Sequence, residues 1–206
     1  MFYKEVIRIE FKDKKPSLYS SKLGGSFIWN SEEVPGLFLA QINLSELPSN
    51  NELPSKGWLQ FFDNGYLTQT EHCVIYRDEL SGRKIENNWK HSPIFKEASM
   101  EFTLNKESIS CSDYKFDVNK YSDEEMEKLW QTNSGEGSKL LGYPFFCQYD
   151  PRESSKTLSE YDTLLLQIDS DDFVMFGDSG VCNYFIKSND LKNKNFSDVF
   201  FSWDCC

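Results

Sequence analysis

The feature that most constrains the fold of this chain is an internal repeat. Three short blocks recur in the same order more than half the chain apart: 21–25 with 138–142, 38–43 with 164–169, and 57–62 with 180–185. Each copy predicts a glycine turn, a buried strand that contains a glutamine, a connection, and a second glycine turn followed by a strand. Three blocks in the same order indicate a duplicated structural unit, so the fold must accommodate that unit twice.

The repeat also predicts the organisation of the chain. We expect repeat unit one over about 21–66 and repeat unit two over about 138–191, with an intervening segment over about 67–121 and a helix over about 122–131. A chain of 206 residues buries enough surface for one core. We therefore expect the two related halves to form a single compact domain over 1–206.

Strands dominate the predicted secondary structure. Ala40 and Ala98 are the only alanines, whereas aromatic residues, which favour strands, make up 16% of the chain. Apolar and charged residues alternate over 7–11 and again over 100–104, as in half-buried strands. The glycine- and asparagine-containing stretch 81–92 predicts a loop. The predicted fold class is α+β, predominantly antiparallel β.

One helix has a clear start signal. Ser122 and Glu125 form a capping-box pattern, and acidic residues fill the first turn, where the helix dipole favours them. Met126, Leu129 and Trp130 then share one face. This pattern predicts a short amphipathic helix that leads into repeat unit two.

Charge limits the class of partner. The chain carries 33 acidic and 22 basic side chains, a formal net charge of −11. Such a surface repels nucleic acid and anionic membranes, and it favours a basic protein partner. The first residues lack a signal-peptide pattern and the cysteines form no C-x-x-C pair. We expect a cytoplasmic protein without a disulfide framework, cofactor or metal site.

The sequence Gly177-Asp178-Ser179-Gly180 matches the nucleophile loop of chymotrypsin-like serine proteases. His72, in Thr-Glu-His-Cys, is the candidate base. The repeat places Ser179 opposite a glycine turn of unit one, and Asp-Ser-Gly is common turn chemistry. We interpret the motif as a structural turn and keep a hydrolase that uses Ser179 and His72 as the alternative.

Five polar residues are candidate binding residues. Gln41 and Gln167 interrupt apolar strands at equivalent positions, so we expect them to face each other or to cap the same backbone groups, with ligand contact as the alternative. Asp169 and Asp171 follow a strand, and Asp178 is the nearest further carboxylate. The aspartates lack the EF-hand pattern, so a polar turn is the preferred interpretation over a cation site.

Several of these blocks together resemble the YwqG family, a bacterial domain of unknown function. The resemblance rests on Ser-Lys-Leu-Gly-Gly, Phe-Leu-Ala-Gln-Ile-Asn-Leu, Lys-Leu-Leu-Gly-Tyr-Pro, Leu-Leu-Gln-Ile-Asp, Gly-Asp-Ser-Gly and the terminal Trp-Asp-Cys-Cys. It implies an α+β fold with antiparallel sheets, no established activity, and a toxin-immunity or partner-binding role. Phe27 stands where the family usually has a proline, which affects the local turn.

The sequence as a whole favours a non-enzymatic acidic protein-binding module, in a toxin-immunity or partner-escort role. The alternatives are the serine hydrolase and a small-ligand-binding domain that uses Trp29, Trp58 or Trp203.

Overall fold

The structure is a computed structural model that describes residues 3–63, 73–87 and 92–205. Its strands are β1 (Tyr3–Lys12), β2 (Lys22–Leu23), β3 (Phe27–Trp29), β4 (Leu37–Asn43), β5 (Trp58–Asp63), β6 (Cys73–Arg77), β7 (Arg83–Ile85), β8 (Ala98–Ser108), β9 (Lys139–Leu141), β10 (Thr163–Asp169), β11 (Val181–Ile186) and β12 (Val199–Asp204). Its helices are α1 (Asp123–Thr132) and α2 (Ser188–Lys192), with 3-10 turns η1 (Leu44–Glu46), η2 (Val118–Lys120) and η3 (Leu158–Glu160).

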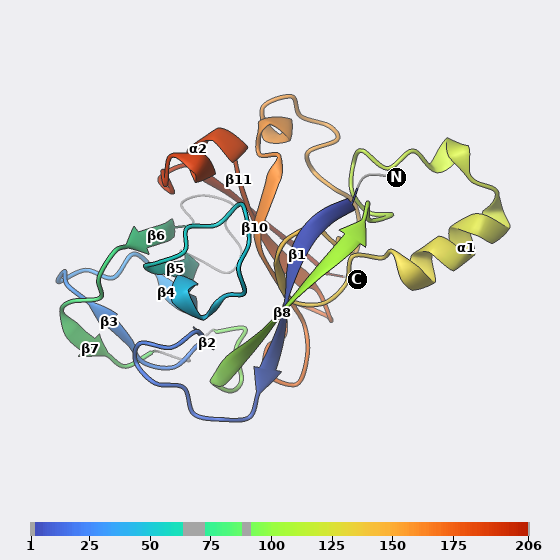
Figure 1. The fold of residues 1–206 in the computed structure, drawn as a ribbon. Coiled ribbons are helices and arrows are strands. Elements are labelled where there is room, and N and C mark those ends of the chain that lie inside the picture. Colours follow the sequence, from blue (N-terminus) through green and yellow to red (C-terminus); the bar gives the residue numbers. More distant parts are fainter. Residues whose placement is uncertain (1–2, 64–72, 88–91, 206) are drawn as a thin grey trace.

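Ten of the described strands form one antiparallel sheet in the order β12-β11-β10-β9-β1-β8-β2-β4-β5-β6. Figure 1 shows β1 and β8 near the middle of the molecule. The repeated blocks occupy mirrored places in the strand order. β2, β4 and β5 extend from β8, and β9, β10 and β11 extend from β1. Both β4–β5 and β10–β11 also contain a register shift at the same point, after Phe38 and after Leu164.

The two central strands are exchanged between the halves. β1 pairs with β8 along its full length, from Tyr3 opposite Ser108 to Lys12 opposite Ser99. β1 precedes β2 in the chain, yet β9 pairs with β1 and β2 pairs with β8. Each half therefore supplies a central strand that pairs with strands of the other half. As a result, the two halves form one continuous sheet.

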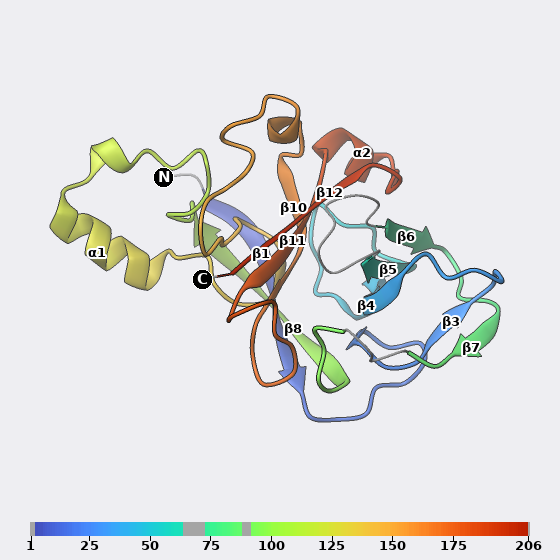
Figure 2. The same ribbon diagram turned by 180° about the vertical axis from the view of Figure 1, so that it is seen from behind.

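The sheet is curved, so that β5 on one side of the central strands contacts β11 on the other side. The Phe61 and Tyr184 rings, from β5 and β11, are 5.1 Å apart in an edge-on contact, and both residues are fully buried. The Tyr184 hydroxyl donates a hydrogen bond to the Phe62 carbonyl over 3.3 Å. Apolar residues from both halves form one main core between these two sides of the sheet. In Figures 1 and 2, α1 projects from one end of the molecule, and the β3–β7 ribbon lies at the other.

The α+β expectation is wrong, because the protein is mostly antiparallel β-sheet. Helix is restricted to α1, α2 and three single turns among the described residues, and no residue of α1 is buried. α1 consequently forms no layer against the sheet, whereas α2 places one buried residue, Leu191, in the main core. The stretch 81–92, predicted to be a loop, contains β7, which pairs with β3. In the described part of the chain, no helix has the length and apolarity needed to cross a membrane.

Candidate functional site

The most distinctive local structure is the connection between β8 and β9, which we call the α1 extension (residues 109–138). Its helix begins where the sequence predicts. The Ser122 backbone N–H donates to the Glu125 carboxylate over 2.8 Å, and the Glu125 N–H donates to the Ser122 hydroxyl over 3.4 Å. The helix ends at Thr132, and Trp130 remains 45% exposed.

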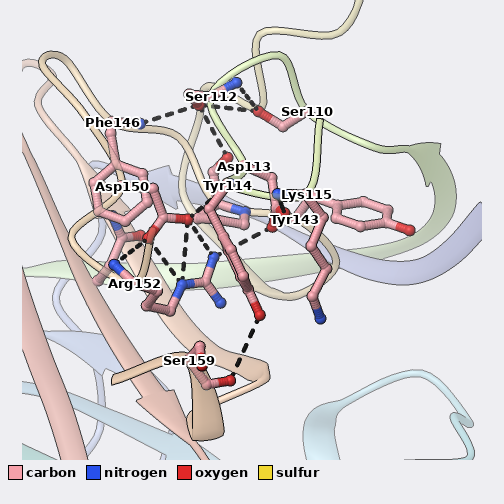
Figure 3. Close-up of polar contacts among 12 residues, drawn as sticks. Ser110, Ser112, Asp113, Tyr114, Lys115, Tyr143, Phe146, Asp150, Arg152 and Ser159 are labelled. Atoms are coloured by element: carbon pink, nitrogen blue, oxygen red, sulfur yellow. Dashed lines mark hydrogen bonds and ion pairs between the residues drawn. The ribbon is translucent and has the colours of Figure 1, made fainter. Parts of the chain in front are cut away.

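Hydrogen bonds close the base of the α1 extension. The Cys111 N–H donates to the Asn133 carbonyl over 2.9 Å, and the Ser110 hydroxyl donates to the Ser134 carbonyl over 2.8 Å. The Ser112 hydroxyl donates to the Pro144 carbonyl over 3.2 Å and accepts the Phe146 N–H over 3.3 Å, which joins the base to the segment after β9. Figure 3 shows Ser112 between Ser110 and Phe146. The extension is thus anchored at its base, while α1 is held away from the sheet.

A buried ion cluster lies beneath this base. Arg152 donates from Nε to Asp150 Oδ1 over 2.9 Å and from Nη2 to Asp150 Oδ2 over 2.6 Å, and Nη2 also contacts Asp113 Oδ2 over 3.2 Å. The guanidinium lies 4.8 Å from the Tyr114 ring centroid (Figure 3). It also lies 4.2 Å from the Phe185 ring centroid. All three charged side chains are at most 5% exposed. Buried charges of this kind require their partners.

The same cluster fixes the loop that follows Ser112. Asp113 Oδ1 accepts the Lys115 N–H over 2.9 Å, and Asp150 Oδ2 accepts the Tyr114 N–H over 3.1 Å. The Tyr114 hydroxyl reaches the Ser159 carbonyl at 3.5 Å. These bonds set the direction in which the Lys115 side chain leaves the backbone.

A cavity of about 680 Å³ opens between the α1 extension and the start of β1. Its walls combine aromatic and charged side chains, among them Lys4, Lys115, Phe116, Tyr121, Leu129 and Tyr143. Burial lowers the pKa of Lys4, while the Asp113 carboxylate raises it and the Lys115 charge lowers it. This volume lies within the range of small-molecule sites, which is about 300–1,000 Å³.

A second charged group, centred on Glu107, lies beside the extension. Lys139 is fully buried, and its Nζ donates to Glu107 Oε1 over 3.0 Å. The same carboxylate accepts from Arg8 Nη2 over 2.6 Å and from the Tyr143 N–H over 2.5 Å. Burial lowers the pKa of Lys139 to about 8, despite the opposing effect of Glu107.

The equivalent lysine of the first half is satisfied differently. Lys22 is 1% exposed, and its Nζ donates to the carbonyls of Ser17, Leu18 and Ser26 over 2.7, 3.0 and 2.9 Å. Burial lowers its pKa to about 8 as well. The recurrent lysine thus lies at a buried structural position in both halves.

Gln41 and Gln167 do not face each other. Each is fully buried and caps the turn before the first strand of its own half. Gln41 Nε2 donates to the Leu18 and Ser20 carbonyls over 3.1 and 2.9 Å. Gln167 Nε2 donates to the Gly135 and Gly137 carbonyls over 2.9 and 2.8 Å. The two glutamines make the same contacts in separate places, so no shared site forms between them.

The three aspartates do not assemble either. Asp169 accepts the Gly137 and Ser170 N–H groups over 2.7 and 2.9 Å, and burial raises its pKa. Asp171 accepts the Phe173 N–H over 2.7 Å, and burial raises its pKa as well, while Asp178 is exposed. Within 3–63, 73–87 and 92–205, no group of three potential metal ligands is found.

Ser179 lies in a tight exposed turn with a φ of 56°, closed by the Gly180 N–H bond to the Phe176 carbonyl over 2.7 Å. No hydrogen bond links the Ser179 hydroxyl to any residue in the described part of the chain. The candidate base, His72, lies outside the described residues.

A model of the family named domain of unknown function DUF1963 matches residues 21–205. The chain belongs to the DUF1963 family. A comparison with curated proteins finds no match to this sequence. The DUF1963 match includes the α1 extension and the Arg152 cluster. It also includes most of the cavity lining, whereas Tyr3 and Lys4 precede the matched residues.

Sequence reasoning missed Lys4, Asp113, Asp150 and Arg152. Asp113 and Arg152 are distant in the chain, and each lies in a polar segment whose composition predicts a loop. The one available signal is the Asp-Pro-Arg sequence at 150–152, which places an acid and a base two residues apart. Nothing in the pattern shows that this pair is buried.

Proposed function

We propose that this DUF1963 protein is a non-enzymatic binding module whose acidic α1 extension docks a basic protein partner. The observation that supports this is α1 itself. It carries Asp123, Glu124, Glu125 and Glu127 against one lysine, and it packs none of its side chains into the core. Its Met126 and Trp130 share one side, as residues four apart on a helix do. An acidic helix with an uncovered aromatic residue suits a partner that is basic and partly apolar.

The charge of the whole chain supports the same kind of partner. A net charge of −11 steers a basic protein toward the surface and raises the association rate. We include in this proposal a role in immunity or partner escort, a relationship to the YwqG family, and a cytoplasmic location.

The test is a pull-down from the lysate of the source cell with α1 charge variants. Glu124 and Glu127 are exposed on α1, so the pair Glu124→Lys and Glu127→Lys changes the docking surface. The matched control is Glu32→Lys with Glu33→Lys, an exposed pair in the first half that changes the net charge equally. We expect a basic protein bound at low salt by the unmodified chain and by the control, and lost at high salt.

Loss of the same protein from the α1 variant at low salt would support the proposal. Equal capture by the α1 variant, or capture of acidic proteins alone, would contradict it.

The serine hydrolase is the second candidate, because Ser179 is exposed and held at an unusual φ. Labelling of the folded protein by a fluorophosphonate, abolished by Ser179→Ala, would support it. The proposed binding module predicts no labelling. Trp29 is a poor candidate for binding a small ligand, because it is 5% exposed and its Nε1–H already donates to the Glu33 carbonyl over 2.7 Å.

A further inference from the structure

The cavity beside the α1 extension contains an imbalance between donors and acceptors. Three carboxylates, Asp113, Asp117 and Asp162, line it together with three lysines, Lys4, Lys115 and Lys120. Whether it suits an anion or a cation depends on which of these groups the protein already uses.

The carboxylates are all used. Asp113 binds Arg152 and the Lys115 N–H, as described above. Asp117 accepts the Asn119 N–H over 3.2 Å and pairs with Lys120 over 3.3 Å. Asp162 has both oxygens on Ser188, with the backbone N–H at 2.8 Å and the hydroxyl at 3.1 Å. These bonds leave little acceptor capacity for a cation in the cavity.

The ammonium groups of Lys4 and Lys115, in contrast, have N–H donors available for a ligand. Lys4 Nζ lies 4.6 Å from the centroid of the Tyr143 ring, and Lys115 Nζ lies 5.1 Å from that of Tyr114. Within the described residues, neither ammonium makes a hydrogen bond or an ion pair with a carboxylate. Burial is the main cause that lowers the pKa of Lys4, and the Lys115 charge also lowers it, while the Asp113 and Glu52 carboxylates act in the opposite direction. An anion between the two ammonium groups would offset the effect of the Lys115 charge and the cost of burying Lys4.

The remaining wall suits a flat apolar group. The Phe116 and Tyr121 rings stack with centroids 5.3 Å apart and planes 6° from parallel. Both rings line the cavity, and Leu129 of α1 lies on the same lining. A ligand with a ring could therefore pack against aromatic side chains while its charged group reaches the lysines.

We propose that this cavity binds a small aromatic anion, whose phosphate or carboxylate contacts Lys4 and Lys115 and whose ring packs against Phe116 and Tyr121. The site is separate from the acidic outer side of α1, so it does not depend on the proposed protein partner. Phosphate and carboxylate share the required chemistry, an acceptor-only anionic group.

The test is calorimetric titration with phenyl phosphate, benzoate and the neutral analogue benzyl alcohol. We expect at least one anion to bind with a dissociation constant of about 1 mM or tighter, and benzyl alcohol to bind at least about tenfold more weakly. The preferred anion then distinguishes phosphate from carboxylate recognition.

Two variants and one control locate the site. Lys4→Met and Lys115→Met should each weaken the preferred anion about tenfold or more. Lys115 is exposed, so its replacement tests the proposal even if Lys4→Met disturbs folding. Lys128→Met removes an exposed lysine on α1, outside the cavity lining, and should leave the affinity unchanged. No binding of either anion, equal binding of benzyl alcohol, or equal losses in all three variants would overturn the proposal.

Discussion

The two connections that follow the central strands differ most between the halves. In the first half, residues 13–21 run directly from β1 to β2, and their carbonyls bind Lys22 and Gln41. In the second half, residues 109–138 run from β8 to β9 and carry η2 and α1. The strands around them match, and so do the glutamine contacts. The strand arrangement that both halves share forms the sheet, and the candidate site lies where the second half departs from the first.

The lysines at the start of β2 and β9 show the same contrast on a smaller scale. Lys22 binds three backbone carbonyls, so its half needs no buried carboxylate there. Lys139 binds Glu107, which in turn binds Arg8 and the Tyr143 N–H. The second half thus concentrates charged groups near the cavity, whereas the first half satisfies the equivalent position with neutral groups.

The largest predicted effect comes from breaking the cluster under the α1 extension. Arg152→Met leaves Asp113 and Asp150 buried without their cation, and we expect a loss of about 3–5 kcal/mol in the free energy of unfolding. Urea denaturation measures it. Arg83→Met, at an exposed arginine of β7, is the control and should cost less than about 0.5 kcal/mol. Similar losses in both variants would contradict the role of the cluster.

The glutamines test whether the halves are equivalent. Gln41→Leu removes the donors to two carbonyls and the acceptor for Gln60 Nε2, and Gln167→Leu removes two donors and the acceptor for the Phe145 N–H. We expect each to cost about 2–3 kcal/mol, since unpaired buried groups cost about 1–3 kcal/mol apiece. Thermal or urea denaturation would show it. If either change left stability untouched, the structural role of that glutamine would be abandoned.

Replacing Lys22 and replacing Lys139 should have unequal effects on stability, in contrast to the two glutamines. Lys22→Met leaves three carbonyls without their donor, offset in part because a charge is no longer buried, and we expect a cost of about 2 kcal/mol. Lys139→Met leaves Glu107 with Arg8 and the Tyr143 N–H, so we expect about 1 kcal/mol. Denaturation curves of the two variants, measured side by side, would sharpen the comparison. A larger loss for Lys139→Met would reverse it.

The same lysines predict a pH dependence of stability. Both have a pKa of about 8 in the folded chain against 10.5 when unperturbed. Between about pH 8 and pH 10 these lysines hold protons in the unfolded chain that they have released in the folded chain, so their contribution to the free energy of unfolding should rise with pH. These values give a rise of about 2 kcal/mol per lysine, which the double variant Lys22→Met with Lys139→Met should lack. An identical pH profile for the double variant would refute this.

How far the sequence predicts the structure depends on whether a feature is local. The helix start at Ser122 and the buried strand around Gln41 follow from patterns within a few residues. The exchange of β1 and β8 does not, because alternation shows that a strand is half-buried and leaves its partner undefined. The Arg152 cluster is missed because it joins two loops that are far apart in the sequence.

One turn shows how the repeat can mislead in detail. Gly24 has a φ of 59°, a value that glycine adopts readily. The equivalent residue in the second half is Leu141, with a φ of 62° and 1% exposure. The backbone shape is retained although the residue is not, because the apolar side chain is buried in the core. Glycine alone is therefore an incomplete guide to the turn.

The most direct test of the account compares the two connections as docking surfaces. A photo-crosslinking amino acid, benzoylphenylalanine, would replace Trp130 on α1 or Tyr19 in residues 13–21, both exposed aromatic residues. After irradiation in the lysate of the source cell, crosslinked proteins would be identified by mass spectrometry at low and at high salt. We predict a basic protein crosslinked from position 130 at low salt only, and none from position 19. The same protein crosslinked from both positions, or from position 19 alone, would contradict the assignment of the docking surface to the α1 extension.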